Sequence, residues 1–266
     1  MRNSIRAISS NLLTPLFLFF LSVPSLAYPY EKIINFDSGV PSGVEIRNSQ
    51  NCSYVPTTLP SGTGNALRCN QGGSLPMYVG LAINPITPLT NNVYVRYYVR
   101  FMPGWTFGFG SSQLKAIIWN GSHRNFTTVE TNGGVGTLMW EDDSCAQYGG
   151  PSGRCLSTGT VAADGRWHLV EAHSYKNGAS GRMEIWLDGT RVMNYTVNIG
   201  AASEATTYIE IGYQNTPSGG YSASRYIEYE DVVIADHYVG PNGATSPDPS
   251  PSPQAPPAPP VNLRVQ

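Results

Sequence analysis

The segment 93–101 holds the clearest set of side chains that could bind a ligand. Its residues alternate, so Tyr94, Arg96, Tyr98 and Arg100 would share one face of an extended strand, opposite a β-branched and aromatic face. Aromatic rings pack against the C–H patches of a sugar, and a guanidinium forks onto a carboxylate as an ammonium cannot. The row predicts a glycan-binding face that favours acidic sugars. The alternative is a solvated face on which the arginines cover aromatic rings.

Two histidines are candidates for proton transfer. His173 and Tyr175 are two residues apart in a predicted strand, so they would point to the same side of a sheet. His123 and Arg124 lie in a predicted turn, where the end of a strand could present them to a groove. Either histidine could act as a general base. A structural or solvated histidine is the alternative in both places.

Two residues on other predicted strands extend this set. Trp119 ends the run 115–119 and would offer an aromatic platform, although a core position is the alternative for a strand tryptophan. Gln214 follows the run 208–213 and could orient a carboxylate.

Paired carboxylates would indicate hydrolysis instead, because a glycoside hydrolase needs two acids across the scissile bond. Glu228 and Glu230 are two residues apart and would share a strand face, but a structural role in one strand is the alternative. Glu184 and Glu210 are single carboxylates without a visible partner.

The elements that must position these residues are strands. Alternating runs separated by Gly-, Asn- and Asp-containing turns occur at 93–101, 115–119, 126–131, 167–175, 182–187, 191–197, 208–213 and 226–235. The turns 176–178 and 188–190 suit hairpins, because Asn-Gly and Asp-Gly accept positive φ. Many short strands with hairpin turns predict an all-β sandwich or jelly roll, in which the apolar faces of two antiparallel sheets form one core.

Four of these runs carry a family resemblance. WHLVEA at 167–172 with GRMEIWLDGTRV at 181–192 resembles the hairpin of concanavalin A-like lectin and glucanase domains. YIEIGY at 208–213 and YIEYEDVVIA at 226–235 resemble later strands of the same domains, the second being their closing strand. Among the enzymes of this fold, the chain is most similar to the secreted polysaccharide lyases of the heparin- and glucuronan-lyase-like group.

The resemblance implies a concanavalin A-like β-jelly-roll sandwich and cleavage of a uronate-containing glycan by β-elimination. That reaction needs a group such as Arg96 to neutralise the uronate, and a base such as His173, His123 or Tyr175 to remove the C5 proton. The alternatives are a non-catalytic lectin-like module, a glycoside hydrolase of the same fold, and an adhesive surface protein.

The resemblance also implies a structural calcium ion. Domains of this kind often hold Ca²⁺ with oxygens from the first and closing strands, where this chain has Asp37 and Asp231. Carboxylate and carbonyl oxygens suit this hard cation. Simple turn and surface roles are the alternative, because no complete ligand loop is visible.

The ends of the chain predict export. Residues 1–27 have a basic start, a short apolar run and Ser-Leu-Ala before the expected cleavage, as in a signal peptide, whereas a membrane anchor would need a longer run. We expect one domain over 28–240, followed at 241–266 by a Pro-rich linker that ends like the first strand of a fibronectin type III module. The chain is then a fragment, or the module has been lost.

Cysteines and charge narrow the compartment and the partners. The spacing favours disulfides Cys52–Cys69 and Cys145–Cys155 among three pairings, and zinc ligation is the alternative. The net charge of −2 and the 13% of charged residues give no large field of one sign, which argues against nucleic acid and anionic membranes. We therefore expect a secreted or periplasmic monomer whose partner is a polysaccharide.

Overall fold

A computed structural model describes most of the predicted domain. The described residues are 30–59, 62–70, 80–84, 90–103, 105, 114–121, 125–132, 135–142, 145, 154–214 and 226–241. The expected signal peptide, the Pro-rich tail after Pro241, His123 and Arg124 lie outside them. In the described part of the chain, no helix is long and apolar enough to cross a bilayer.

The first layer is an eight-stranded antiparallel sheet, with the order β13-β12-β11-β6-β15-β4-β3 and β1 paired to β15. Its strands are β1 (Glu31–Ile34), β3 (Cys52–Leu59), β4 (Gly62–Asn70), β6 (Asn92–Phe101), β11 (Trp167–Tyr175), β12 (Arg182–Leu187), β13 (Thr190–Thr196) and β15 (Tyr226–Ala235). The central pair β6 and β15 comes from distant parts of the sequence, so this sheet assembles residues that the sequence separates.

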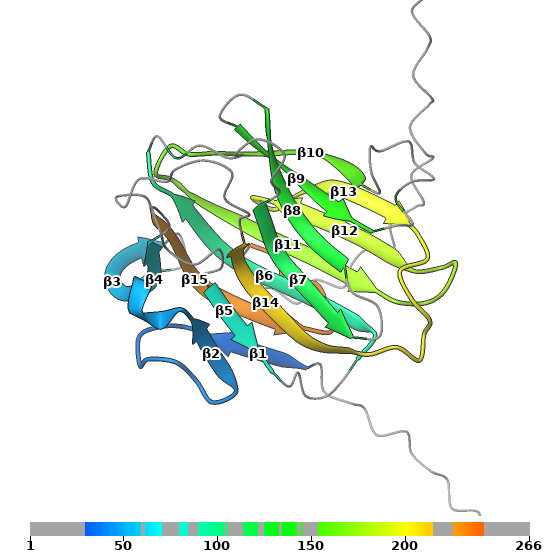
Figure 1. The fold of residues 1–266 in the computed structure, drawn as a ribbon, viewed down its shortest axis with the longest axis horizontal. Helices are drawn as coiled ribbons and strands as arrows, with labels where there is room; N and C mark the ends of the chain where they lie inside the picture. The colour runs from blue at the N-terminus through cyan, green and yellow to red at the C-terminus, as the bar shows by residue number, and fades with distance from the viewer. Residues whose placement is uncertain are drawn as a thin grey trace, which may run out of the picture.

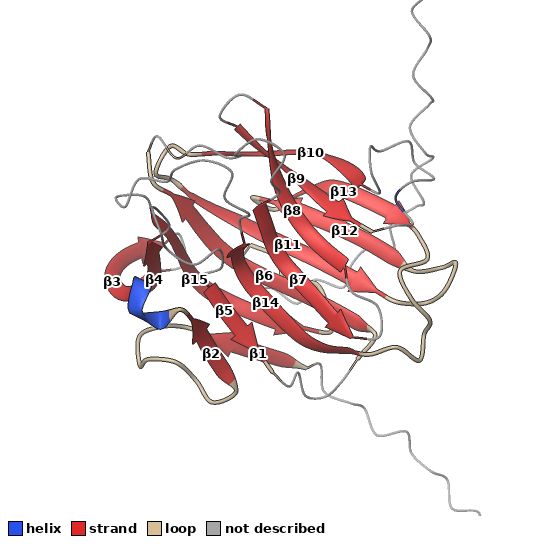
Figure 2. Ribbon diagram, in the orientation of Figure 1, coloured by secondary structure: helices blue, strands red, loops and turns tan. Residues whose placement is uncertain are grey.

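The second layer is a seven-stranded antiparallel sheet with the order β10-β9-β8-β7-β14-β5-β2. Its strands are β2 (Val44–Arg47), β5 (Gly80–Ile83), β7 (Leu114–Gly121), β8 (Asn125–Asn132), β9 (Val135–Glu141), β10 (Arg154–Ala162) and β14 (Thr206–Gln214). It overlies the first sheet in Figure 1. The helical segment in Figure 2 is one 3₁₀ turn, Ser49–Asn51.

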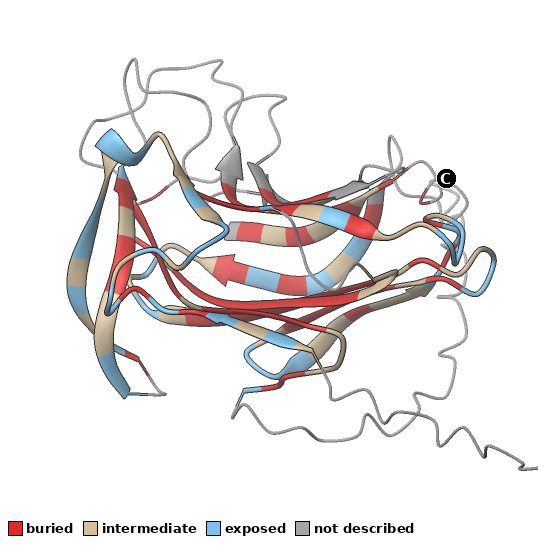
Figure 3. Ribbon diagram, turned by 90° about the horizontal axis from the view of Figure 1, so that it is seen from below, coloured by how far each residue is buried: buried red, intermediate tan, exposed pale blue. Residues whose placement is uncertain are grey.

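The core lies between the two layers, which Figure 3 shows edge-on with buried residues along their strands. Val95 and Val99 of β6 and Ile209 and Ile211 of β14 belong to one buried apolar cluster. Because side chains alternate along a strand, the intervening residues face outward on each sheet. The predicted all-β sandwich of two antiparallel sheets is confirmed, and every alternating run falls on a strand, although 191–197 extends one residue past β13.

Both predicted disulfides are present. Cys52 and Cys69 lie opposite each other on β3 and β4, and Cys145 is bonded to Cys155 at the start of β10. In the described part of the chain no cysteine is free. The disulfides join β3 to β4 and the 145 region to β10, as an oxidising compartment would permit.

The predicted Asp-Gly hairpin turn is also present. Asp188 and Gly189 join β12 to β13 with φ values of 51° and 79°, and Leu187 pairs with Thr190. Two consecutive residues of positive φ are what a type I′ hairpin requires.

Candidate functional site

The outer face of the eight-stranded sheet carries most of the predicted site. Tyr94, Arg96, Tyr98 and Arg100 alternate with core residues of β6, as the sequence indicated. On the neighbouring β11, His173 lies opposite Tyr94, and Tyr175 follows on the same side. The sheet therefore brings the predicted arginines, tyrosines and histidine onto one face.

A segment after β15 covers the centre of this face. The exposed fractions of Tyr94, Arg96, Tyr98 and His173 are only 4–6%. Val239 and Tyr238 pack against Tyr94 and Trp186. Tyr94 could reach a substrate only if this segment moved aside, whereas Tyr98 is buried beside Leu59 and Leu169.

Glu171 fastens the covering segment. Its two carboxylate oxygens accept hydrogen bonds from the backbone N–H groups of Val239 and Gly240, at 2.8 and 2.9 Å. Burial raises the pKa of Glu171 to about 7, while these N–H groups and the nearby Arg96 act in the opposite direction. The attachment thus depends on a carboxylate that titrates near neutral pH.

His173 is held between two acceptors. Its Nδ1 is 2.7 Å from Glu184 Oε2, and its Nε2 is 2.6 Å from Asn92 Oδ1. The Asn92 amide donates its Nδ2 hydrogen to the Asp236 carbonyl, which fixes Oδ1 toward the histidine. Both ring nitrogens therefore face acceptor oxygens, and neither is presented to a substrate as a proton acceptor. This arrangement favours the structural alternative for His173.

The partners of His173 complete a buried cluster. Tyr94 stacks on the histidine with ring centroids 3.9 Å apart, and Tyr175 lies on its other side at 6.3 Å. Burial acts to raise the pKa of Glu184, but the hydrogen bond and charge of His173, together with Arg191, bring that pKa below its usual value. The cluster is a satisfied charge network within the described residues.

The end of this face near Arg100 is more open. Arg68, Glu228, Arg100 and Trp167 lie in one row across β4, β15, β6 and β11. Both arginines bind the fully buried Glu228, Arg68 through Nε at 2.7 Å and Arg100 through Nε at 2.5 Å. The predicted dyad of Glu228 and Glu230 is thus two buried carboxylates, one of them held by guanidinium groups.

Glu230 belongs to an acidic cluster that contains both residues of the predicted calcium site, Asp37 and Asp231. A Cβ added to Gly64 would lie 2.8 Å from Asp37 Oδ1 and 3.3 Å from Glu230 Oε1, so both carboxylates lie against this glycine. Burial raises the pKa of Glu230 to about 7, and the charges of Asp231 and Asp37 raise it too. Among the described residues no three His, Cys, Asp or Glu side chains form a metal cluster, so a cation would also need backbone oxygens.

The outer face of the seven-stranded sheet holds a set of residues that the sequence did not reveal. Arg47 Nη2 donates to the Tyr208 hydroxyl at 2.8 Å, and that hydroxyl donates to Glu210 Oε1. Tyr208 and Glu210 are two residues apart on β14, whereas Arg47 comes from β2. The alternation around Ile209 could have placed Tyr208 with Glu210, but nothing local indicated the arginine.

The contacts of this set shift the pKa values of Arg47 and Tyr208. The hydrogen bond to Tyr208 raises the pKa of Arg47, although burial opposes it. Burial and the hydrogen bond to Glu210 raise the pKa of Tyr208, so its hydroxyl stays protonated at neutral pH. Glu45 binds Arg47 Nη1 at 3.0 Å, and their side chains are 62% and 38% exposed. The cluster combines a fixed cation, a proton donor and a carboxylate.

Two glycines lie next to Arg47 in the sheet. Gly80 of β5 lies opposite Arg47, and Gly212 of β14 lies opposite Gly80. A Cβ on Gly80 would be 2.2 Å from the Ile211 carbonyl oxygen, so this strand pair needs glycine there. No side chain therefore stands next to Arg47 on these two strands.

Two other predicted contacts have different positions. Trp119 is fully buried and stacks on Trp140 with ring centroids 5.3 Å apart. It is therefore a core residue and not an aromatic platform. Gln214 is the last residue of β14, and its backbone pairs with Lys115 of β7. Gln214 thus lies on the same strand as Tyr208 and Glu210.

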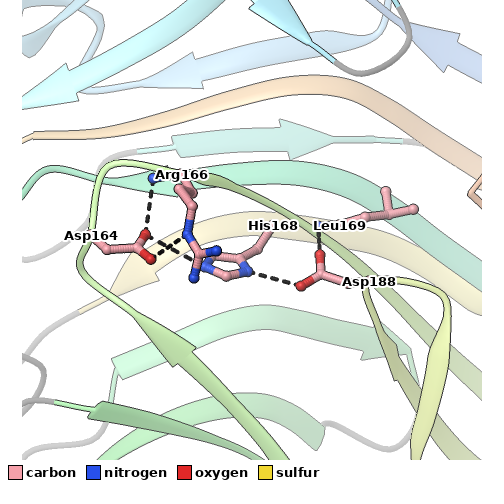
Figure 4. A network of polar contacts seen from close by, with 5 residues as sticks. All are labelled: Asp164, Arg166, His168, Leu169 and Asp188. Carbon is pink, nitrogen blue, oxygen red and sulfur yellow. Dashed lines mark hydrogen bonds and ion pairs between the residues drawn. The ribbon is translucent and has the colours of Figure 1, made fainter.

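A third histidine lies in the charged network of Figure 4. His168 Nδ1 is 3.0 Å from Asp188 Oδ2, and its Nε2 is 3.9 Å from Asp164 Oδ1. Asp188 also accepts the backbone N–H of Leu169, which joins β11 to the Asp-Gly turn. His168 Nε2 is buried and has no hydrogen-bond partner among the residues that the structure describes, so this histidine is not presented to a substrate.

Comparison with known proteins defines the class. No protein-family model and no curated protein sequence matches the chain. Among solved structures, the chain is similar to the cellulose induced protein Cip1, with a TM-score of 0.53 and 16% identity over 79% of this chain and 99% of that one. The protein therefore has the concanavalin A-like β-sandwich fold.

Two enzyme structures align less closely. The alginate lyase Aly36B, in a double mutant bound to alginate tetrasaccharide, gives a TM-score of 0.48 and 17% identity over 78% of this chain and 97% of that one. The endo-β-1,4-glucuronan lyase from the fungus Trichoderma reesei gives a TM-score of 0.46 and 15% identity over 77% of this chain and 94% of that one.

Proposed function

We propose that the protein is a secreted polysaccharide lyase that cleaves a uronate-containing glycan on the outer face of the seven-stranded sheet. The observation that carries this proposal is the continuous hydrogen-bonded set of Arg47, Tyr208 and Glu210. A β-elimination needs a cation for the uronate, a base for the C5 proton and an acid for the departing oxygen. This set contains one group for each task.

Arg47 binds the uronate carboxylate. Its exposed ion pair with Glu45 is worth at most about 1 kcal/mol, so a substrate carboxylate can replace Glu45. A guanidinium binds a carboxylate through two parallel N–H groups, which orients the sugar as well as neutralising it. Gly80 and Gly212 add no side chain next to this arginine on β5 and β14.

Glu210 and Tyr208 transfer the protons. Glu210 takes the C5 proton as the C4–C5 double bond forms and the C4–O bond breaks. Tyr208, kept protonated by its raised pKa, donates its hydroxyl proton to the departing oxygen. The hydrogen bond between the two side chains then returns the proton from Glu210 to Tyr208, which restores both groups.

The assay is the absorbance of the unsaturated uronate during incubation with alginate, glucuronan or heparin. We expect product from the wild type, and a fall in kcat of about 10²–10⁴-fold in Tyr208→Phe with glycan binding retained. Tyr54→Phe, which removes a hydroxyl from an exposed tyrosine, is the matched control. Arg47→Lys should raise KM, because lysine lacks the two parallel N–H groups with which a guanidinium binds a carboxylate.

Two outcomes would replace this proposal. Glycan binding without product on every acidic glycan would indicate a lectin-like module, and new reducing ends without the unsaturated absorbance would indicate a hydrolase. Equal rates for Tyr208→Phe and the wild type would remove Tyr208 from the mechanism.

We also propose that Ca²⁺ binds between Asp37 and Glu230, with Asp231 adding negative charge. The buried Glu230 is repelled by the charges of Asp231 and Asp37, and a hard divalent ion would relieve this repulsion. Added CaCl₂ should raise the Tm of the wild type but not of Glu230→Gln. Equal shifts in both proteins would place any calcium elsewhere.

A further inference from the structure

We propose a second binding site for acidic polysaccharide on the outer face of the eight-stranded sheet, opposite the proposed active site. The site is the row of Ser53, Arg68, Glu228, Arg100 and Trp167, which we call the arginine row. Its members lie opposite one another on five adjacent strands, β3, β4, β15, β6 and β11. The inference does not depend on the lyase activity.

The charge of the row exceeds what its internal contacts need. The two guanidiniums of Arg68 and Arg100 bind one carboxylate, that of the completely buried Glu228. The row therefore has a net charge of +1. One arginine would neutralise Glu228, so the second is in excess for a purely structural pair. An uncompensated cation at a partly open surface attracts anionic groups.

The outer edges of both guanidiniums remain available. Arg68 and Arg100 bind Glu228 through Nε and Nη2, and their side chains are 33% and 27% exposed. Within the described residues, neither Nη1 group has a hydrogen-bond partner. Each arginine can therefore hold the buried glutamate on one edge and a ligand oxyanion on the other.

Aromatic rings hold the guanidinium planes in place. The Cζ atom of Arg68 is 4.1 Å from the centre of the Tyr226 ring, and that of Arg100 is 4.6 Å from the centre of the Trp167 ring. This stacking reduces the rotamer entropy that binding would otherwise cost. The covering segment packs on the Tyr94 end of the face, whereas Trp167 and Tyr226 stay partly exposed.

The dimensions favour a polymer over a single small anion. Five strands at a spacing of about 4.8 Å place the ends of the row roughly 19 Å apart. The two arginines are separated by one strand, at roughly twice the strand spacing. A chain that repeats carboxylate or sulfate groups could engage both guanidiniums and lie against Trp167.

The decisive variant is Ser53→Glu, with Ser53→Gln as the matched neutral control. Ser53 is exposed and lies opposite Arg68 on the edge strand, so both variants should fold, and urea unfolding checks this. The new carboxylate would compete for the outer edge of Arg68. We measure calorimetric binding of an alginate oligosaccharide in an Arg47→Gln background, which lacks the guanidinium of the proposed active site.

We expect Arg47→Gln to bind the oligosaccharide, Ser53→Glu to weaken that binding at least tenfold, and Ser53→Gln to leave it unchanged. The double variant Arg68→Lys/Arg100→Lys keeps two positive charges beside Glu228, but a lysine has no second N–H edge for the ligand, so this variant should also bind the oligosaccharide weakly. Equal affinities for Ser53→Glu and Ser53→Gln, or no binding in Arg47→Gln, would overturn the second site. Inorganic sulfate competing as well as the oligosaccharide at equal anion concentration would also contradict a polymer site. The readout is binding, so a failed lyase assay leaves this test valid.

Discussion

Glu171 should make the stability of the protein fall as pH rises through the weakly acidic range. The carboxylate is buried against the backbone N–H groups of Val239 and Gly240, and its pKa rises from the usual 4.5 to about 7. At about 1.4 kcal/mol for each unit of pKa, this difference corresponds to roughly 3 kcal/mol. That is a large part of the stability of a typical domain.

The sign follows from proton binding. Below pH 4.5 the carboxyl is protonated in both states, and its full contribution to the free energy of unfolding is present. Between pH 4.5 and about 7 the folded protein keeps a proton that the unfolded chain has lost. Linkage then makes the free energy of unfolding fall as pH rises across this window, and the contribution is lost above about pH 7.

Urea unfolding from pH 4 to pH 8 measures this effect. We expect the free energy of unfolding of Glu171→Gln, which cannot ionise, to change by up to about 3 kcal/mol less than that of the wild type between pH 4.5 and pH 7. Glu45→Gln, at an exposed carboxylate, should follow the wild type. Only differences in slope are compared, because the amide also loses one acceptor oxygen. Parallel curves for the wild type and Glu171→Gln would refute the reasoning.

Three further substitutions test the fold. Replacing Cys52 and Cys69 together by serine opens a loop of 17 residues and should lower the free energy of unfolding by about 3 kcal/mol, as measured in urea. Gly80→Ala forces a Cβ onto a main-chain oxygen of β14 and should lower the free energy of unfolding by about 3 kcal/mol. Gly39→Ala, whose Cβ meets no atom, should lower it by about 1 kcal/mol. Equal losses in the two variants would contradict the clash. Trp119→Ala should cost about 3–5 kcal/mol because the ring is in the core, whereas a platform role would change glycan affinity at unaltered stability.

The architecture was predictable because its causes are local. Strict alternation in 93–101 fixed which residues of β6 face the core, since a strand has a side-chain period of two. Asp188 and Gly189 indicated their hairpin turn because few residues adopt positive φ. The cysteine spacing favoured the two disulfides that the structure contains.

The candidate site was predictable only in part. The sequence placed Arg96, Arg100 and His173 on one face, but it gave no sign that Val239 and Gly240 would cover its centre. The covering segment is short and lacks a pattern of its own, because backbone N–H groups of any residue can bind a buried carboxylate. Arg47 was missed since its partner Tyr208 is 161 residues away.

The sequence by itself determined the all-β character, the side of each strand that faces the core, and the turns, because these depend on neighbouring residues. Only the tertiary structure decided which outward side chains meet, since strand order brings β2 to β14 and β15 to β6. It also decided which of those side chains water can reach, because burial depends on what packs above a sheet face. Arg100 is partly exposed and Arg96 is buried, although they are two residues apart on the same face of one strand.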